Sequence, residues 1–286
     1  MRTSGPGWHV ADFRAAYVPE AEEMRKAHFW FVEGVALTAA MWFGGHAANA
    51  DLITLQASRD AAMYQSNDGS LANGAGRYLF AGKTNQNLAR RSVLQFDVAS
   101  AVPAGAQITA ARLTLNLSQV NAGSGARDVS LALALSPWTT GASNPADTEA
   151  SGALALAGDC TWLHSSADGA GGGTLWETAG GDFAAFASAT VSTQALGLYT
   201  WSSLGLLNDV RLFAQDPSRN HGWFLLGDES TAGTARRFDS ADSALEGGIV
   251  PTLEIEYSFI PAPGPVVLLA IAALITPLRS RRARRA

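Results

Sequence analysis

Two segments in which apolar and polar residues alternate dominate the middle of the chain. Residues 90–98 place apolar and polar side chains on opposite sides, and residues 108–117 do the same with three leucines on one side. This period of two is typical of a β-strand with one buried face. Pro103 and Gly105, between the segments, favour a chain reversal. The pattern therefore predicts two paired antiparallel strands in a sheet that is buried on one face and solvated on the other.

Shorter segments with strand-like patterns surround this pair, separated by turn-forming residues such as Asn73-Gly74. Apolar residues recur at helical spacing over residues 204–215 and stop at Asp216-Pro217, which predicts one short amphipathic helix. The remaining predicted strands cover residues 52–57, 62–64, 78–81, 129–135, 191–192, 198–201, 223–226, 236–239 and 252–257.

A Gly- and Ala-rich passage, residues 136–189, carries three tryptophans and no sustained period. It is too long for an ordinary loop, so we expect it to wrap one edge of the sheet. About ten short strands and one helix in roughly 210 residues predict an all-β fold, a single jelly-roll-type β-sandwich. We expect an N-terminal signal helix and a C-terminal hydrophobic helix to flank it.

Charge and cysteine content narrow the function classes. Only 16% of the residues are charged, and the segment from Asp51 to Ile260 holds 20 acidic residues against 11 basic ones, a net charge of −9. A negatively charged domain repels the phosphate groups of nucleic acid, which argues against nucleic acid as a partner. Cys160 is the single cysteine, so an internal disulfide framework is excluded.

The N-terminal region has the three parts of a secretory signal. Basic residues follow Met24, a mostly apolar run extends to Phe43, and Ala48 and Ala50 form a small-x-small cleavage site. We interpret residues 24–50 as a signal peptide and residues 1–23 as an extension upstream of the true start. The alternative is a buried N-terminal helix, which would rarely end in Ala-x-Ala before the first strand. Cleavage would leave Asp51 as the mature N-terminus.

Residues 259–286 form a second distinctive segment. A stiff stretch with Pro261, Pro263 and Gly264 precedes an apolar run, and a basic end follows it. A short apolar run stopped by arginines indicates a membrane stop with its basic end in the cytoplasm. The alternative, a C-terminal core helix with a solvated end, is disfavoured because the run is apolar all round. The residues expected to carry this signal are Pro261, Pro263, Gly264, Arg279, Arg281 and Arg282.

These residues resemble the PEP-CTERM sorting signal, which combines a Pro-x-Pro-Gly box, an apolar helix and an arginine cluster. The resemblance implies processing by an exosortase-like enzyme after a transient stay in the inner membrane of a Gram-negative bacterium. Ala262 stands where that family usually has glutamate.

Residues 51–258 resemble the DNRLRE domain, a secreted β-sandwich grouped with the carbohydrate-binding modules. The similarity is spread over several short motifs in the same order and spacing. The resemblance implies a module for adhesion or glycan binding, here without a catalytic domain. The matching segments are residues 91–98, 102–115, 158–162, 176–183, 236–240 and 251–253.

Catalytic motifs are scarce in the part expected after cleavage. Cys160 and His164 are four residues apart, but residues 161–163 have a strand-like pattern, in which that spacing separates the side chains. We therefore predict that Cys160 is a small, buried, apolar side chain. Two histidines leave no zinc cluster, and no nucleophile elbow or phosphate loop occurs. We expect a non-catalytic protein; a glycan lyase or hydrolase would need carboxylates or a His–Tyr–Arg group in one cleft.

Binding candidates are aromatic and acidic. Trp138 and Trp176 lie in the Gly-rich passage, where an exposed indole would stack on sugar rings, whereas the three tryptophans in strands are expected in the core. Even for these two, burial in the core is the alternative. Asp60, Asp68 and Asp239 lie near strand ends and are candidate calcium ligands; solvated turn carboxylates are the alternative.

Taken together, the sequence predicts an exported protein of the extracellular space or outer cell surface that binds or structures polysaccharide. The alternative is a purely structural or adhesive protein that makes protein contacts. An aromatic platform in a groove would favour the first, and a flat polar surface with an open edge strand would favour the second.

Overall fold

The computed structural model describes residues 50–259, so most of the signal peptide and nearly all of the sorting segment lie outside the described residues. Ala48, Pro261, Pro263, Gly264, Arg279, Arg281 and Arg282 are among those outside; Ala50 is the first described residue and is exposed.

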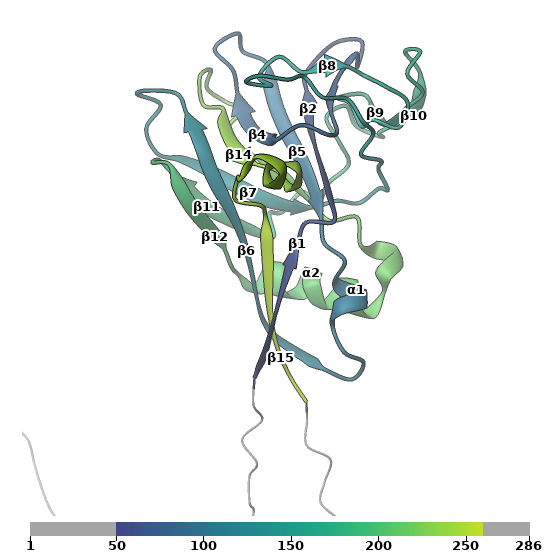
Figure 1. Ribbon diagram of the computed structural model, residues 1–286, viewed down its shortest axis with the longest axis vertical. Helices are drawn as coiled ribbons and strands as arrows, with labels where there is room; N and C mark the ends of the chain where they lie inside the picture. The colour runs from purple at the N-terminus through teal and green to yellow at the C-terminus, as the bar shows by residue number, and fades with distance from the viewer. Residues whose placement is uncertain (1–49, 260–286) are drawn as a thin grey trace, which may run out of the picture. The chain divides into compact units, whose positions relative to one another are not determined.

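The described residues form an antiparallel β-sandwich (Figure 1). The main path of hydrogen-bonded neighbours runs through β1 (Asp51–Gln56), β15 (Thr252–Ser258), β6 (Gln107–Val120), β14 (Arg236–Asp239), β4 (Tyr78–Lys83), β5 (Ala89–Gln95), β13 (Trp223–Leu226), β7 (Arg127–Leu133) and β11 (Ala189–Thr193). The path turns back on itself at β4, which pairs with β14 through residues 78–81 and with β5 through Gly82 and Lys83.

Four further strands extend this sheet, and two form a small one of their own. β12 (Gly197–Trp201) pairs with β6, and β2 (Arg59–Tyr64) pairs with β5. On its other side β2 pairs with β3 (Leu71–Asn73), which in turn pairs with β8 (Ala153–Leu154). The separate two-stranded sheet consists of β9 (His164–Ala167) and β10 (Gly173–Leu175). Mostly antiparallel strands with few helices confirm the all-β prediction.

The main core lies between the two layers of the sandwich. Leu94 and Phe96, at the end of β5, pack in one cluster with Leu113, Leu115 and Leu117 of β6. These are the apolar sides of the two alternating segments. The two strands nevertheless do not pair with each other: β5 pairs with β2, β4 and β13, whereas β6 pairs with β12, β14 and β15. The predicted hairpin is therefore wrong.

The connection between β5 and β6 explains that error. Asp97 caps the short helix α1 (Val98–Ala101) by accepting a hydrogen bond from the backbone of Ser100, and the Pro103–Gly105 turn follows. These residues carry the chain from one layer to the other instead of folding it back within one sheet. The buried leucines of β6 face β5 across the core rather than beside it.

Helix α2 (Leu204–Gln215) spans the predicted residues, which confirms that prediction. Ser203 accepts a hydrogen bond from the Leu206 amide, the usual way to satisfy a free N–H at a helix start. Four apolar residues, Leu206, Leu207, Val210 and Phe213, are buried in the main core. Two short 3-10 helices, η1 (Pro217–Arg219) and η2 (Ala241–Glu246), complete the elements. No helix in residues 50–259 has the length and apolar character needed to cross a bilayer.

We name the chain between β7 and β11, residues 134–188, the cover; it contains nearly all of the predicted Gly-rich passage, residues 136–189. Its strand β8 extends one edge of the sheet at β3, as expected, but its tryptophans lie on the outer face of the layer that contains β2, β5 and β13. Trp138, Cys160, Trp162 and Trp176 pack there against outward-facing residues such as Phe224, forming a second core. The layer containing β5 is therefore buried on both faces.

Glycines allow the cover to pack closely against the sheet and against itself. A Cβ on Gly181 would lie 2.2 Å from the Phe224 ring, and one on Gly141 would lie 1.7 Å from Oδ1 of Asp159. Both residues also have positive φ angles, of 106° and 74°, which side chains disfavour. The high glycine content of this passage thus reflects close packing as well as chain reversal.

Candidate functional site

The two tryptophans proposed as a sugar-stacking platform are buried. Trp138 is 2% exposed and Trp176 is 5% exposed, so the expectation that they present open rings is wrong. The Nε1 of Trp138 donates to the carbonyl of His221 at 2.8 Å, and the Nε1 of Trp176 donates to the carbonyl of Thr161 at 2.9 Å. The guanidinium of Arg59 also lies 4.3 Å from the centre of the Trp138 ring. Both indoles hold the cover against the sheet.

The three aspartates proposed as calcium ligands have separate roles. Asp60 is buried and accepts a hydrogen bond from the Ala241 amide at 2.7 Å. Asp239 is also buried and accepts one from Nδ2 of Asn116 at 2.7 Å, while Asp68 caps an exposed turn. Within residues 50–259, no three His, Cys, Asp or Glu side chains are grouped to hold a metal ion. The structure does not bring these carboxylates together as a calcium site.

Cys160, a residue of the cover, is buried in the second core, as predicted, but residues 161–163 form a turn rather than a strand. The hydroxyl of Thr161 accepts hydrogen bonds from the amides of Leu163 and His164 and lies 3.1 Å from Nδ1 of His164. Burial raises the pKa of the Cys160 thiol to about 12. At neutral pH this sulfur is a protonated thiol, which is a poor nucleophile.

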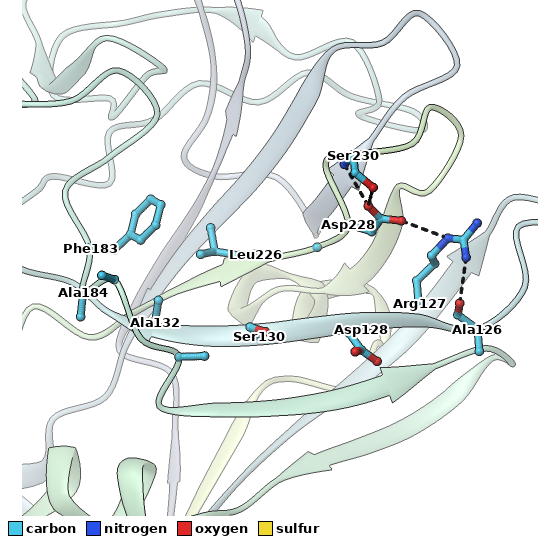
Figure 2. Close-up of a pocket in the computed structure, with 13 residues that line it drawn as sticks. Ala126, Arg127, Asp128, Ser130, Ala132, Phe183, Ala184, Leu226, Asp228 and Ser230 are labelled. Carbon is cyan, nitrogen blue, oxygen red and sulfur yellow. Dashed lines mark hydrogen bonds and ion pairs between the residues drawn. The ribbon is translucent and has the colours of Figure 1, made fainter.

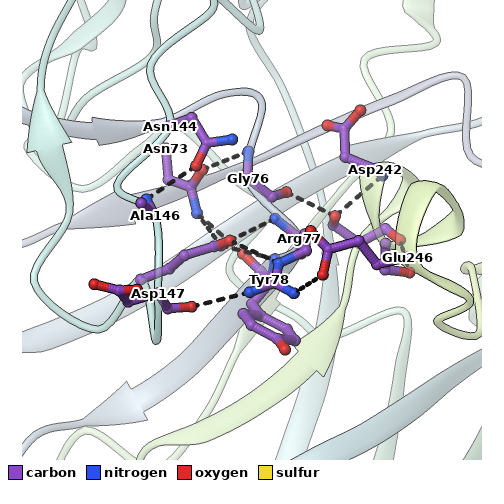
Figure 3. A network of polar contacts seen from close by, with 12 residues as sticks. Asn73, Gly76, Arg77, Tyr78, Asn144, Ala146, Asp147, Asp242 and Glu246 are labelled. Carbon is purple, nitrogen blue, oxygen red and sulfur yellow. Dashed lines mark hydrogen bonds and ion pairs between the residues drawn. The ribbon is translucent and has the colours of Figure 1, made fainter.

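Sequence reasoning did not single out Glu149, which accepts hydrogen bonds in a polar network with Asn73, Arg77 and Tyr78. Figure 3 shows these three residues and their neighbours. The buried carboxylate of Glu149 accepts hydrogen bonds from the amides of Arg77 and Tyr78 at 2.8 and 2.9 Å and from Nδ2 of Asn73 at 2.8 Å. Arg77 also forms an ion pair with Glu246. A cavity of about 300 Å³ adjoins this network. The carboxylate satisfies three donors inside the fold, which makes Glu149 a structural anchor for the cover.

An open groove of about 620 Å³ crosses the outer face of the sheet beside the cover (Figure 2). Its floor is formed by outward-facing residues of β7, including Ser130 and Ala132, and by the end of β13. Phe183 lies at one end of the groove, and a polar group around Asp228 lies at the other. The lining residues are Ala126, Arg127, Asp128, Ser130, Ala132, Phe183, Ala184, Ala185, Ala187, Leu226, Gly227, Asp228 and Ser230.

The polar end of the groove contains a fixed ion pair. Nε of Arg127 lies 3.3 Å from Oδ2 of Asp228, and Oδ1 of Asp228 accepts hydrogen bonds from the amide and hydroxyl of Ser230 at 2.9 and 2.6 Å. The Ser230 hydroxyl is the main cause that lowers the pKa of Asp228. The carboxylate therefore stays ionised over the neutral pH range and serves as a hydrogen-bond acceptor. Asp128 adds a second exposed carboxylate nearby.

The apolar end of the groove is built from one aromatic and several small side chains. Phe183 is half-buried, with its ring 5.2 Å from the Phe224 ring and 5.1 Å from the Arg91 guanidinium. Alanines and Gly227 line the space between this ring and the ion pair. The groove thus offers donors and acceptors at one end, an aromatic edge at the other, and unobstructed floor between them.

No protein-family model and no curated protein matches this chain. The choice of a candidate site therefore relies on the geometry of the described residues.

Sequence reasoning missed the polar end of this groove for a clear reason. Arg127 and Asp228 are 101 positions apart and have no motif in common. They meet because β7 and β13 are neighbours in the sheet, a pairing that the alternation pattern does not reveal. Phe183 follows a pair of glycines and Asp182, and nothing in that segment distinguishes a groove residue from a core residue.

Proposed function

We propose that this chain is an exported, non-catalytic β-sandwich protein that binds polysaccharide in the groove across β7 and β13. The observation that carries the proposal is the groove itself, whose volume of about 620 Å³ lies within the usual range for ligand sites. Sugar hydroxyls both donate and accept hydrogen bonds, so the Arg127–Asp228 pair complements them. The ring of Phe183 offers an apolar edge for the C–H face of a sugar.

The resemblance to the DNRLRE domain supports the same assignment, because that family is grouped with carbohydrate-binding modules. The signal-like residues 24–50 support export, and the PEP-CTERM-like tail supports processing by an exosortase-like enzyme. On this proposal the protein is anchored transiently in the inner membrane and then acts outside the cell or on its outer surface.

The second candidate is a structural or adhesive protein, and one observation favours it. β1 forms an edge of the sheet, with Leu52 exposed and its outer backbone groups available for pairing. The outer face of the adjoining strands is polar, with an ion pair between Arg112 and Glu256 and a hydroxyl contact between Thr114 and Thr200. A flat polar face beside an open edge suits contacts with other proteins.

A polysaccharide pull-down with matched variants of the full chain tests the proposal. We expect Asp228→Asn, which removes the charged acceptor, and Ser130→Trp, which fills the floor of the groove, each to weaken retention by roughly tenfold, the loss that corresponds to about 1.4 kcal/mol. Glu254→Gln, on β15 and outside the groove, is the control and should bind like the parent. Equal retention by all variants would remove the groove from the proposal. Absence of retention by the parent on every polysaccharide tested would favour the structural candidate.

A further inference from the structure

A second pocket, of about 340 Å³, lies where β4 turns the sheet from one layer to the other, and we call it the corner pocket. It shares no lining residue with the groove. Its wall contains three arginines and four side-chain amides but no aspartate or glutamate, although the described body carries an excess of acid. The lining residues are Phe80, Thr84, Asn85, Gln86, Arg90, Gln119, Val120, Asn121, Ala150, Ser151, Ala235, Arg236 and Arg237.

Arg90 is the most unusual residue of this wall, because it is a buried cation without a carboxylate. It is 6% exposed, and no Asp or Glu among residues 50–259 lies within ion-pair distance of it. Its Nη1 and Nη2 donate to the carbonyls of Ala89 and Ala150 at 3.0 and 3.2 Å, and its guanidinium lies 4.8 Å from the Tyr64 ring.

The Nε of Arg90 is fully buried and has no hydrogen-bond partner in the described part of the chain. Buried donors in folded proteins are almost always satisfied, because an unpaired one loses its water without compensation. Burial also lowers the pKa of Arg90, because removal from water disfavours its charged form. An anion beside this guanidinium would neutralise the charge.

Arg237 provides a second cation on the same wall. It is half-buried, its guanidinium lies 3.7 Å from the centre of the Tyr78 ring, and its Nε donates to the Ser118 hydroxyl at 3.3 Å. Its two terminal nitrogens donate to no residue within 50–259. Stacking on an aromatic ring fixes the plane of a guanidinium while leaving its edge free for a ligand.

The third arginine, Arg236, has a different role. Its side chain is fully buried, and its nitrogens donate to neighbouring hydroxyl and carbonyl oxygens, including those of Thr193, Ser124 and Gly125. These donors are occupied within the fold, so Arg236 is not assigned a direct ligand contact.

We propose that the corner pocket binds an oxyanion, the carboxylate, sulfate or phosphate group of a small molecule or of a larger ligand. Arg90 and Arg237 supply the charged donors, since a planar guanidinium matches two oxygens of such a group. The amides of Asn85, Gln86 and Gln119 supply neutral donors around it. The absence of lining carboxylates prevents repulsion of the anion. This site is independent of the polysaccharide groove and stands even if the groove binds no sugar.

Calorimetric titration and thermal melting of the full chain, with ionic strength held constant by sodium chloride, test the proposal. The probes are inorganic sulfate, inorganic phosphate and a free hexuronic acid, with a neutral hexose for comparison. At least one anion should bind and raise the melting temperature above the chloride baseline, and the hexose should not. The anion that binds best identifies the group for which the pocket is shaped.

Two variants test the pocket without a substitution of Arg90, since Arg90 is buried and replacing it would affect folding as well as binding. Arg237→Gln removes a charged donor, and Gln119→Glu places a carboxylate in the wall at nearly constant volume. Each should weaken anion binding by roughly tenfold or more, because charge-assisted hydrogen bonds are the strong ones. Arg112→Gln, on the same strand as Gln119 but outside the pocket, should bind like the parent. Anion binding that is unchanged in both pocket variants, or no binding of any anion by the parent, would overturn the proposal.

Discussion

Asp60 illustrates how burial sets the chemistry of one residue. Its side chain is 3% exposed, and burial is the main cause that raises its pKa to about 7, with the charge of Asp242 adding to the rise. The hydrogen bond from the Ala241 amide acts in the opposite direction but is the weaker effect. In the unfolded chain the same carboxyl would titrate near 4. Between about pH 4 and pH 7 the carboxyl of Asp60 is therefore protonated in the folded protein and ionised in the unfolded chain.

This difference predicts a pH-dependent stability difference for Asp60→Asn. Between about pH 4 and pH 7 the folded state binds the extra proton, so this group makes the free energy of unfolding fall as pH rises through that window. The rise in pKa corresponds to roughly 4 kcal/mol between the two ends, as an order of magnitude. Asparagine cannot ionise, so the variant should gain stability relative to the parent as pH increases. Urea unfolding of both proteins from pH 4 to pH 8 measures the difference.

Asp242→Asn provides the matched control for that prediction. It removes the neighbouring charge that raises the pKa of Asp60 but leaves the buried carboxyl in place. Without that charge the pKa of Asp60 is lower in the folded state, so the stability loss of this variant with rising pH should end at a lower pH and be smaller than in the parent. Asp60→Asn should show no loss from this group. A stability difference between parent and Asp60→Asn that is constant with pH would show that Asp60 titrates normally.

At the scale of elements, the cover is the part of the fold that departs furthest from regular structure. Carboxylates anchor it in addition to the short pairing of β8 with β3. Asp159 accepts hydrogen bonds from the amides of Ala142, Ser143 and Leu156. Asp182 accepts them from the amides of Glu177 and Thr178, and Glu149 from those of Arg77 and Tyr78. Each anchor satisfies several backbone donors that would otherwise be buried without a partner. The tryptophans then fill the space between these anchors and the sheet.

Trp176→Ala tests whether the cover is a packed layer. The ring contacts Phe224 edge-on, with the ring centres 5.6 Å apart, so truncation leaves a cavity in the second core. We expect a loss of about 3–5 kcal/mol in the free energy of unfolding and a marked drop in melting temperature. Phe186→Ala, in the same passage but 89% exposed, should change stability by no more than about 0.5 kcal/mol. Similar melting of both variants would contradict the packed layer.

Elements also show what the sequence could and could not predict. Residues 204–215 were predictable as a helix because helical spacing, the cap at Ser203 and the stop at Asp216-Pro217 all act locally. The alternation in β5 and β6 identified both strands but not their partners. A period of two shows which face of a strand is buried, but not which strand pairs with it. The groove depends on the same missing information, since Arg127 and Asp228 come from strands whose pairing no local signal encodes.

At the scale of the whole described body, the two ends lie together. β1 and β15 pair over their full lengths, with Asp51 opposite Tyr257, and Figure 1 shows both leaving the sandwich at the same end. Each is next to a segment that we propose is processed, the signal peptide before β1 and the sorting tail after β15. Both proposed processing events would therefore occur on one side of the sandwich, and the other end would be free for ligands.

This arrangement sharpens the prediction for the N-terminus of the exported protein. Ala50 is exposed and Asp51 is the first residue of β1, so cleavage between them would leave the pairing with β15 whole. Cleavage several residues further on would remove the backbone hydrogen bonds of β1 together with Ile53 and Leu55, whose side chains are partly buried. We therefore expect mass spectrometry of exported material to give Asp51 as the first residue. A mature N-terminus beyond Leu55, or exported protein that retains residues 1–23, would contradict the signal-peptide assignment. Ala48→Leu, which spoils the small-x-small site, should leave uncleaved precursor in the same experiment, because the processing enzyme requires small side chains at those two positions.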